Sequence, residues 1–261
     1  MFWNISPNIN IFGLSVHLYG LFFALGLLFG GLAVIKKMQK LNVPQNYFIY
    51  AFAGIFIGAR LFHCFFYESS YFFTNPLKML LPCSVEDGKL KFIGYQGLSS
   101  HGGTIGLMVA LWFYSRKTKL NYLQICDIFT FAVPLAGGFI RLGNLMNSEI
   151  LGSPTTVSWA FVFPATDLIP RHPAQLYEAI WYFLLAGFML ILFKKIDFKF
   201  RYGFYTGIGL VGVAVFRFLI EFLKSPQVDF ESTMILNVGQ LLSIPFIIAG
   251  IFLIIFTTKT H

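Results

Sequence analysis

The sequence predicts an all-α polytopic membrane protein of about seven transmembrane helices, with its N-terminus outside and its C-terminus in the cytoplasm. Three observations support this fold class. Hydrophobic residues make up 57% of the 261 residues and charged residues only 11%, against roughly 25% charged residues in an ordinary soluble domain. Apolar segments of helix length recur along the chain, and the basic residues gather in short clusters between them.

The apolar segments are about 17 to 22 residues long, which at ~1.5 Å per residue is enough to cross a bilayer core. We predict seven spans in chain order, and the third is the shortest. They cover residues 14–35, 47–67, 98–114, 122–140, 173–193, 203–223 and 235–256.

The distribution of Lys and Arg predicts the orientation, because loops on the cytoplasmic side carry an excess of these residues. With the N-terminus outside, the inner loops hold eleven: Lys36, Lys37, Lys40, Arg116, Lys117, Lys119, Lys194, Lys195, Lys199, Arg201 and Lys259. The outer loops hold five: Lys78, Lys89, Lys91, Arg171 and Lys224. The two segments long enough to fold on their own account, 68–97 and 141–172, are then both on the outer side.

The length permits a single membrane-embedded domain over residues 1–261, and no internal repeat is visible. The net charge of +8 follows from the loop clusters, and no basic, aromatic-interleaved motif indicates nucleic-acid binding. Cys64, Cys83 and Cys126 lack metal-ligand spacing, so we expect neither a metal site nor structural disulfides. We expect no cofactor.

Charged and polar residues, which cost free energy inside a membrane, gather at one depth toward the outer ends of the predicted spans. Arg60, Arg141 and Arg217 lie there together with several carboxylates. Each has a plain structural explanation when taken singly. For example, Arg217 and Glu221 are spaced i,i+4 and can neutralise each other. Taken together, they predict a site for an anionic lipid headgroup, because the planar guanidinium donates two hydrogen bonds to phosphate oxygens.

The stretch 141–152 reads RLGNLMNSEILG. It resembles the signature R-x-G-N-x-x-N-x-E-x-x-G of prolipoprotein diacylglyceryl transferases, with six fixed residues at set spacing. These residues are Arg141, Gly143, Asn144, Asn147, Glu149 and Gly152.

Four further segments resemble the same family in the expected order: HLYG at 17–20, HGG at 101–103, RHPAQLYE at 171–178 and RFLIEF at 217–222. The resemblance therefore covers most of the chain. Some positions depart from the family pattern. Ser148 replaces the usual glycine between Asn147 and Glu149, and Val213 stands where a tyrosine is usual.

The resemblance implies an enzyme that transfers diacylglyceryl from phosphatidylglycerol to the lipobox cysteine of a prolipoprotein. The reaction forms a thioether, releases glycerol-1-phosphate and is the first step of lipoprotein maturation. The implied partners are phosphatidylglycerol, the prolipoprotein signal peptide with its lipobox cysteine, and membrane lipids. The implied location is the bacterial inner (cytoplasmic) membrane, crossed several times, with the active site facing the outer, periplasmic leaflet.

The resemblance also suggests roles for individual residues. Arg141 and Arg217 form a phosphate clamp, Asn144 and Asn147 donate further hydrogen bonds, and Glu149, Glu178 and Glu221 hold the arginines. His101 is the candidate base and Tyr19 a candidate headgroup contact. The remaining substrate-binding candidates are Gly102, Gly103, Gly152 and His172.

Other classes of protein remain open at this point. A lipid or solute transporter with an outer-leaflet site for an anionic headgroup would also carry polar residues inside its bundle, although substrate sites near mid-membrane and inverted repeats are more typical of transporters. A metal-dependent membrane phosphotransferase would need paired aspartates, which the predicted spans lack. A lipid-binding scaffold without catalysis is the third alternative.

Overall fold

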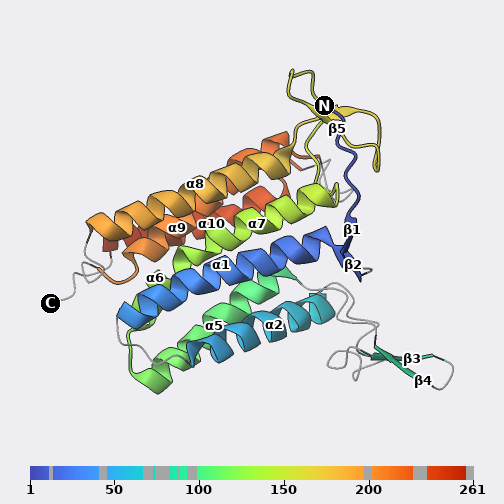
Figure 1. Cartoon of the computed structure of the whole chain (residues 1–261). Coiled ribbons are helices and arrows are strands. Elements are labelled where there is room, and N and C mark those ends of the chain that lie inside the picture. Colours follow the sequence, from blue (N-terminus) through green and yellow to red (C-terminus); the bar gives the residue numbers. More distant parts are fainter. Residues whose placement is uncertain are drawn as a thin grey trace. The chain divides into compact units, whose positions relative to one another are not determined.

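The computed structural model describes residues 1–11, 14–40, 46–66, 73, 83–86, 89–92, 99–196, 201–225 and 234–256. Within these residues, six helical segments are long and apolar enough to cross a membrane (Figure 1). The all-α polytopic membrane fold is therefore confirmed. The six consist of α1 (Leu18–Lys40), α2 (Tyr47–Phe66), α6 (Tyr122–Thr130) with α7 (Ala132–Met146), α8 (Ala174–Lys195), α9 (Phe204–Ile220) and α10 (Val238–Phe256).

The third predicted span corresponds to α5 (Ser100–Thr118). It is helical over 19 residues but is not among the six apolar helices. Its ends explain this, because Ser and His open the helix and Arg116 and Lys117 close it. A seventh span at this position stays a prediction.

The first span begins later than predicted. Residues 14–17 are not helical: β2 (Leu14–His17) pairs antiparallel with β1 (Asn8–Ile11), so that Asn8 lies opposite His17. The alternation Leu-Ser-Val-His fits a strand, whose side chains point to opposite faces in turn. At its other end, α1 continues past residue 35 to Lys40, since long basic side chains can reach the polar interface.

The fourth span differs from the prediction at two points. It breaks between α6 and α7, where Pro134 has no N–H to donate to the carbonyl of Thr130. It also continues to Met146, so Arg141 lies within α7 and does not close the span. The outer loop predicted over 141–172 therefore starts only at Asn147.

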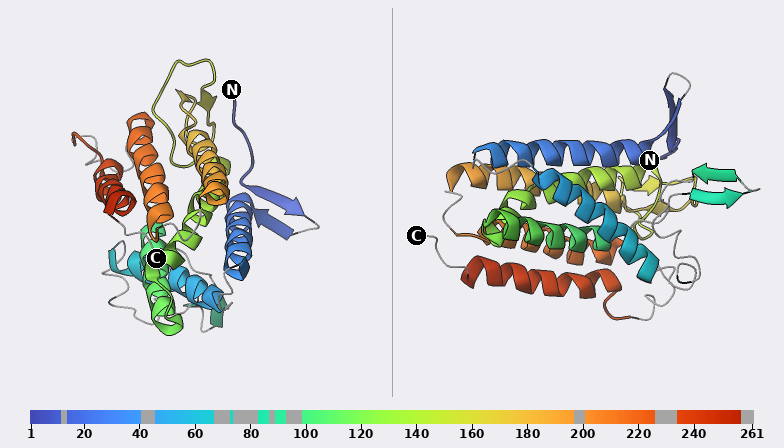
Figure 2. Two further views of the ribbon diagram at one scale, coloured as in Figure 1. Left: turned by 90° about the vertical axis from the view of Figure 1, so that its left-hand side faces the viewer. Right: turned by 90° about the horizontal axis from the view of Figure 1, so that it is seen from below.

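The chain divides into two compact units, residues 1–40 with 127–261 and residues 41–126. In the first unit, α1 packs on α7, α7 on α8, α8 on α9, and α9 on α10. Figure 2 shows α1 lying along α7 in two further views. Because successive spans alternate in direction, the ends of α7 and α9 and the starts of α1, α8 and α10 lie at the same end of this unit (Figure 1).

The second unit is built on α2 and α5, which pack closely through glycines. A Cβ atom at Gly102 would collide with the carbonyl oxygen of Gly58 and the Cβ of Phe62. The absence of a side chain at Gly102 is therefore required by helix packing. Of the predicted outer loop 68–97, β3 (Cys83–Glu86) and β4 (Lys89–Phe92) form an antiparallel hairpin; apart from residue 73, the rest lies outside the described residues.

A small β-element connects α7 to α8 in the first unit. β5 (Phe161–Val162) pairs antiparallel with β6 (Pro170–Arg171), and Phe2 forms a parallel bridge to Val162. Its apolar core contains Leu145, Phe161 and Phe163, with Trp3 packed against them. The indole N–H of Trp3 also donates to the Leu145 carbonyl at 3.0 Å. This element is thereby attached to the last turn of α7.

Candidate functional site

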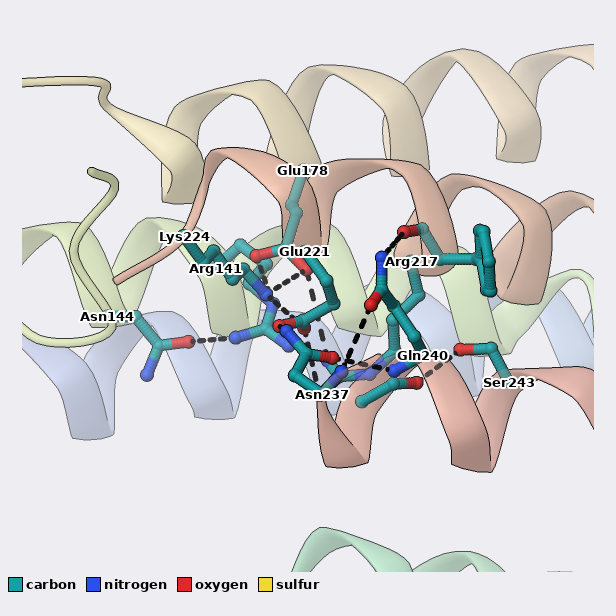
Figure 3. A network of polar contacts seen from close by, with 11 residues as sticks. Arg141, Asn144, Glu178, Arg217, Glu221, Lys224, Asn237, Gln240 and Ser243 are labelled. Atoms are coloured by element: carbon teal, nitrogen blue, oxygen red, sulfur yellow. Dashed lines mark hydrogen bonds and ion pairs between the residues drawn. The ribbon is translucent and has the colours of Figure 1, made fainter. Parts of the chain in front are cut away.

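Five charged side chains meet at the end of the first unit where α7 and α9 end and α8 begins (Figure 3). Glu178 lies at the centre, with its Oε2 3.3 Å from Arg141 Nε and its Oε1 3.1 Å from Lys224 Nζ. Glu221, in the 3₁₀ turn η1 (Glu221–Leu223), is the second carboxylate. Its Oε1 lies 3.4 Å from Arg217 Nη2 and 3.0 Å from Lys224 Nζ. The Nη1 of Arg217 is also 4.0 Å from Glu178 Oε1.

The five side chains differ in exposure. Those of Glu178, Glu221 and Lys224 are only 0%, 6% and 1% exposed, whereas Arg141 and Arg217 are 14% and 28% exposed. The arginine side chains are thus the most exposed members of the cluster. Buried charges persist only when they are paired, and here the carboxylates behind the arginines provide the pairing.

Helical spacing places three of these residues on one face. Arg217 and Glu221 are four residues apart, and Glu221 and Lys224 are three apart. Glycine at the start of α10 lets that helix approach, since a Cβ at Gly239 would lie 2.7 Å from the Cδ of Glu221. Asn237 then donates from Nδ2 to Glu221 Oε2 at 3.0 Å. Both oxygens of Glu221 are therefore occupied.

A chain of hydrogen bonds links the cluster to the rest of the signature. Arg141 Nη1 donates to Asn144 Oδ1 at 3.2 Å, and Asn144 Nδ2 donates to Glu149 Oε1 at 2.7 Å. The buried side chain of Gln175 donates to the carbonyl of Glu149 at 2.6 Å. Glu149 therefore reaches Arg141 through Asn144.

The turn after α7 has an unusual backbone. Ser148 and Ile150 have φ angles of 51° and 58°. This left-handed conformation is common for glycine but rare for most other residues. Ser148 stands where the resembling family usually has glycine, and the left-handed backbone explains that preference. The strained turn directs Glu149 back toward Asn144.

Two glycines of the signature lie against other candidate residues. A Cβ at Gly143 would be 3.0 Å from the Tyr19 ring, so Tyr19 packs directly on α7. A Cβ at Gly152 would collide with the carbonyl of His172, to which the Gly152 N–H donates at 3.2 Å. The ring of His172 contacts the Tyr177 hydroxyl at 3.3 Å. Gly152 also forms an antiparallel bridge to Lys224.

Comparison with known proteins identifies the family of this chain. A family model described as Prolipoprotein diacylglyceryl transferase matches residues 7–256. The chain belongs to this family. A relative from Bacteroides fragilis, named phosphatidylglycerol–prolipoprotein diacylglyceryl transferase, is 49% identical over 98% of this chain and 95% of its own length. Relatives of the same name from Chloroherpeton thalassium and Tolumonas auensis are 42% and 39% identical, each over 99% of this chain and over 95% and 98% of their own lengths.

In this member of the prolipoprotein diacylglyceryl transferase family, the first unit brings ten of the predicted site residues to one end. They are Tyr19, Arg141, Asn144, Asn147, Glu149, Gly152, His172, Glu178, Arg217 and Glu221. Glu178 and Glu221 contact the arginines as expected. The side chain of Asn144 accepts from Arg141 and donates to Glu149, and its expected hydrogen bond to phosphate stays a prediction. Asn147 caps α7 through its backbone N–H, which donates to the Gly143 carbonyl.

The other three predicted residues, His101, Gly102 and Gly103, lie in the first turn of α5 in the second unit. The N–H of Gly102 donates to the Ser99 hydroxyl at 3.4 Å, and Ser99 thereby caps the start of this helix. A Cβ at Gly103 would make only ordinary contacts, 3.5 Å from Ile55. The side chain of His101 lies outside the described part of the structure.

Lys224 is the residue that the sequence reasoning missed. The sequence places it in an outer loop, and it does lie just past η1, but its side chain is buried between two carboxylates and is not a solvent-exposed loop charge. Burial lowers the pKa of the Lys224 ammonium, and the charges of Glu178 and Glu221 act in the opposite direction. Its i,i+3 spacing from Glu221 was the available signal.

Proposed function

We propose that this chain transfers the diacylglyceryl group from phosphatidylglycerol to the lipobox cysteine of prolipoproteins, with Arg141 and Arg217 as the phosphate-binding pair. The observation that supports these roles is the pairing of two partly exposed arginine side chains with two buried carboxylates. The named relatives, similar over nearly their full length, act on the same lipid and protein substrates.

The chemistry accounts for the arginines. The cysteine sulfur attacks the carbon of the diacylglycerol part that carries the phosphate. A C–S bond forms there, and the bond between that carbon and the phosphate oxygen breaks. The phosphodiester leaves as a glycerol-1-phosphate monoester, so negative charge grows on its oxygens. Guanidinium groups held in advance by Glu178 and Glu221 stabilise that charge without reorganising, which is the most effective form of electrostatic catalysis in a water-poor site.

The substrate thiol must lose its proton, because a thiol of pKa ~8.5 is mostly protonated at neutral pH. We assign the removal of this proton to His101, because an unperturbed histidine side chain titrates near ~6.5. His101→Asn should then lose transfer strongly at pH 7 and recover partly at higher pH, where the substrate thiol ionises unaided. A variant that stays mostly active at pH 7, with no relative gain at high pH, would contradict this role.

We also propose that the chain forms one functional domain in the bacterial inner membrane, with the arginine pair facing the periplasmic leaflet. The Lys and Arg distribution supports this orientation. Eleven basic residues lie in the loops assigned to the inside and five in those assigned to the outside. A membrane-impermeant thiol reagent should label Cys83 from the periplasm and reach a cysteine at position 117 only after the membrane is opened. The reverse pattern would reject the orientation.

Reconstitution tests the reaction itself. Purified protein in vesicles with labelled phosphatidylglycerol and a lipobox peptide should give a thioether-linked diacylglyceryl peptide and free glycerol-1-phosphate. A peptide whose cysteine is replaced by serine is the matched control and should remain unmodified. Movement of lipid across the membrane without any thioether product would instead favour a transporter.

A further inference from the structure

We propose that Lys224 is a positioning residue that offsets the carboxylates behind the arginine pair and so gives the cluster the positive charge that favours binding of a phosphodiester. This inference rests on the proposed function, in which Arg141 and Arg217 bind the phosphate of the lipid. Lys224 itself does not touch the lipid, because its side chain is only 1% exposed. Its action on the substrate is therefore exerted through the carboxylates and arginines in front of it.

The position of the ammonium group is closely defined. Lys224 Nζ donates to Glu178 Oε1 at 3.1 Å and to Glu221 Oε1 at 3.0 Å, and so bridges the two carboxylates. Each of these carboxylates also contacts an arginine, Glu178 through Arg141 and Glu221 through Arg217. The two arginine side chains are the more exposed members of the group, and the carboxylates and the lysine are buried.

The charges of these five side chains explain why a lysine is present. Two arginines and two glutamates alone sum to zero, and a neutral group would have little preference for an anionic lipid. Lys224 raises the sum to one positive charge. A phosphodiester carries one negative charge, so the bound lipid and the cluster neutralise each other. Glu149 is joined to Arg141 through the neutral amide of Asn144. When its charge is included, the sum is zero with Lys224 and minus one without it, so in either count the lysine makes the cluster more favourable to an anionic lipid.

The backbone holds Lys224 against the signature. The Ser153 N–H donates to the Leu223 carbonyl at 2.8 Å, and the Ser225 N–H donates to the Leu151 carbonyl at 3.2 Å. These bonds flank the bridge between Gly152 and Lys224. The end of the signature and the charge-balancing lysine therefore move as one piece.

Four variants separate charge balance from a purely structural role. Lys224→Met removes the charge with little change of volume, and Lys224→Arg keeps it. Lys224→Met combined with Glu221→Gln removes one charge of each sign and restores the surplus. Lys36→Met is the matched control, because Lys36 is exposed at the opposite end of α1. Melting temperature is measured for each variant, so that only folded protein is compared.

The primary measurement is the dissociation constant for phosphatidylglycerol in phosphatidylcholine nanodiscs, without peptide, so that no turnover occurs. Loss of one charge some 10 Å from the phosphate should weaken binding about tenfold in Lys224→Met. The double variant and Lys224→Arg should return to within about threefold of the unmutated protein, and Lys36→Met should bind normally. The kcat/KM for transfer should also fall in Lys224→Met and be retained in Lys224→Arg. The double variant is judged by binding alone, because Glu221 also holds Arg217.

Unchanged binding by folded Lys224→Met would overturn the inference, as would a double variant that binds as weakly as Lys224→Met. The proposed function fails in a different way. If the variants show the expected binding pattern but the unmutated protein transfers nothing to the lipobox peptide, the proposed reaction is rejected and the charge-balance inference stands. If the unmutated protein has no preference for phosphatidylglycerol over phosphatidylcholine, the charge-balance inference fails.

Discussion

Asp127 and Glu178 are both fully buried carboxylates in membrane-spanning helices, yet their surroundings differ completely. Asp127 accepts hydrogen bonds from the Gly203 N–H and from the N–H and hydroxyl of Thr206, all at 2.7 Å. These donors are neutral, and they belong to the first turn of α9. Asp127 therefore caps a neighbouring helix, at the end of the unit opposite to the charged cluster.

Glu178, by contrast, is surrounded by cations. Its two oxygens face Arg141, Arg217 and Lys224, and Oε2 lies close to Arg141 without the angle of a hydrogen bond. A buried carboxylate satisfied by backbone amides indicates a structural cap, whereas one that collects exposed arginines indicates a binding site. The identity of the partners distinguishes the two cases, and depth in the membrane does not.

Removal of either arginine should give the largest effect. Arg141→Ala or Arg217→Ala should lower kcat/KM for transfer by a factor of about 10² to 10³, the usual effect of losing one preorganised donor to a developing anion. Lysine should restore only part of the activity, because it lacks the bidentate geometry. Transfer is measured at matched protein insertion. Near-normal turnover in both alanine variants would remove the basis for the cluster as the active site.

Replacement of the central carboxylate should have the next largest effect. Glu178→Gln keeps the shape but no longer holds Arg141 and Arg217 by charge, and small misplacements of catalytic groups cost up to about a hundredfold in rate. We expect kcat to fall by about ten- to a hundredfold while the affinity for phosphatidylglycerol does not weaken. Steady-state kinetics over a range of lipid fractions separate the two constants. Equal loss of affinity would mean that Glu178 acts on ground-state binding.

The matched change at the other carboxylate should affect stability. In Asp127→Asn an amide N–H₂ faces donors, so about 1 to 3 kcal/mol of unfolding free energy should be lost through the unsatisfied groups. The kcat/KM of the folded protein should stay within about twofold, because the change lies far from the cluster. Thermal unfolding and transfer are measured on the same preparation. A large loss of activity without loss of stability would contradict the purely structural role of Asp127.

The smallest expected effect concerns the strained turn after α7. Ser148→Gly should raise the unfolding free energy by about 1 kcal/mol, because a left-handed backbone costs an L-residue roughly that amount. Val157→Gly, outside the left-handed region, is the control and should bring no such gain. A loss of stability in Ser148→Gly would show that the serine side chain outweighs the backbone strain.

Much of the fold is readable from the sequence, because hydropathy over some twenty residues is a strong and local signal. The errors occur where a competing local signal is short. Leu14–His17 is apolar enough for a span, but its alternation favours a strand. Pro134 marks the break between α6 and α7, a position that a hydropathy average does not resolve.

The site was predictable to the extent that its residues lie in a contiguous signature. Arg141, Asn144 and Glu149 are within nine residues of one another, and the structure joins them by hydrogen bonds. Lys224 was not found, because a lysine just beyond a span reads as a solvent-exposed charge. Its role depends on Glu178, a partner 46 residues away that no local pattern connects to it.

That separation has a consequence for biosynthesis. At about 5 to 20 residues per second, the ribosome adds Lys224 several seconds after Glu178. During that interval the carboxylate has Arg141 as its available partner, since Arg217 also emerges later. Glu178 lies in the first turns of α8, so it can remain hydrated at the membrane surface until the later helices arrive. The charged cluster is thus completed late in translation, and chains that stop before residue 217 should be targets for membrane proteases.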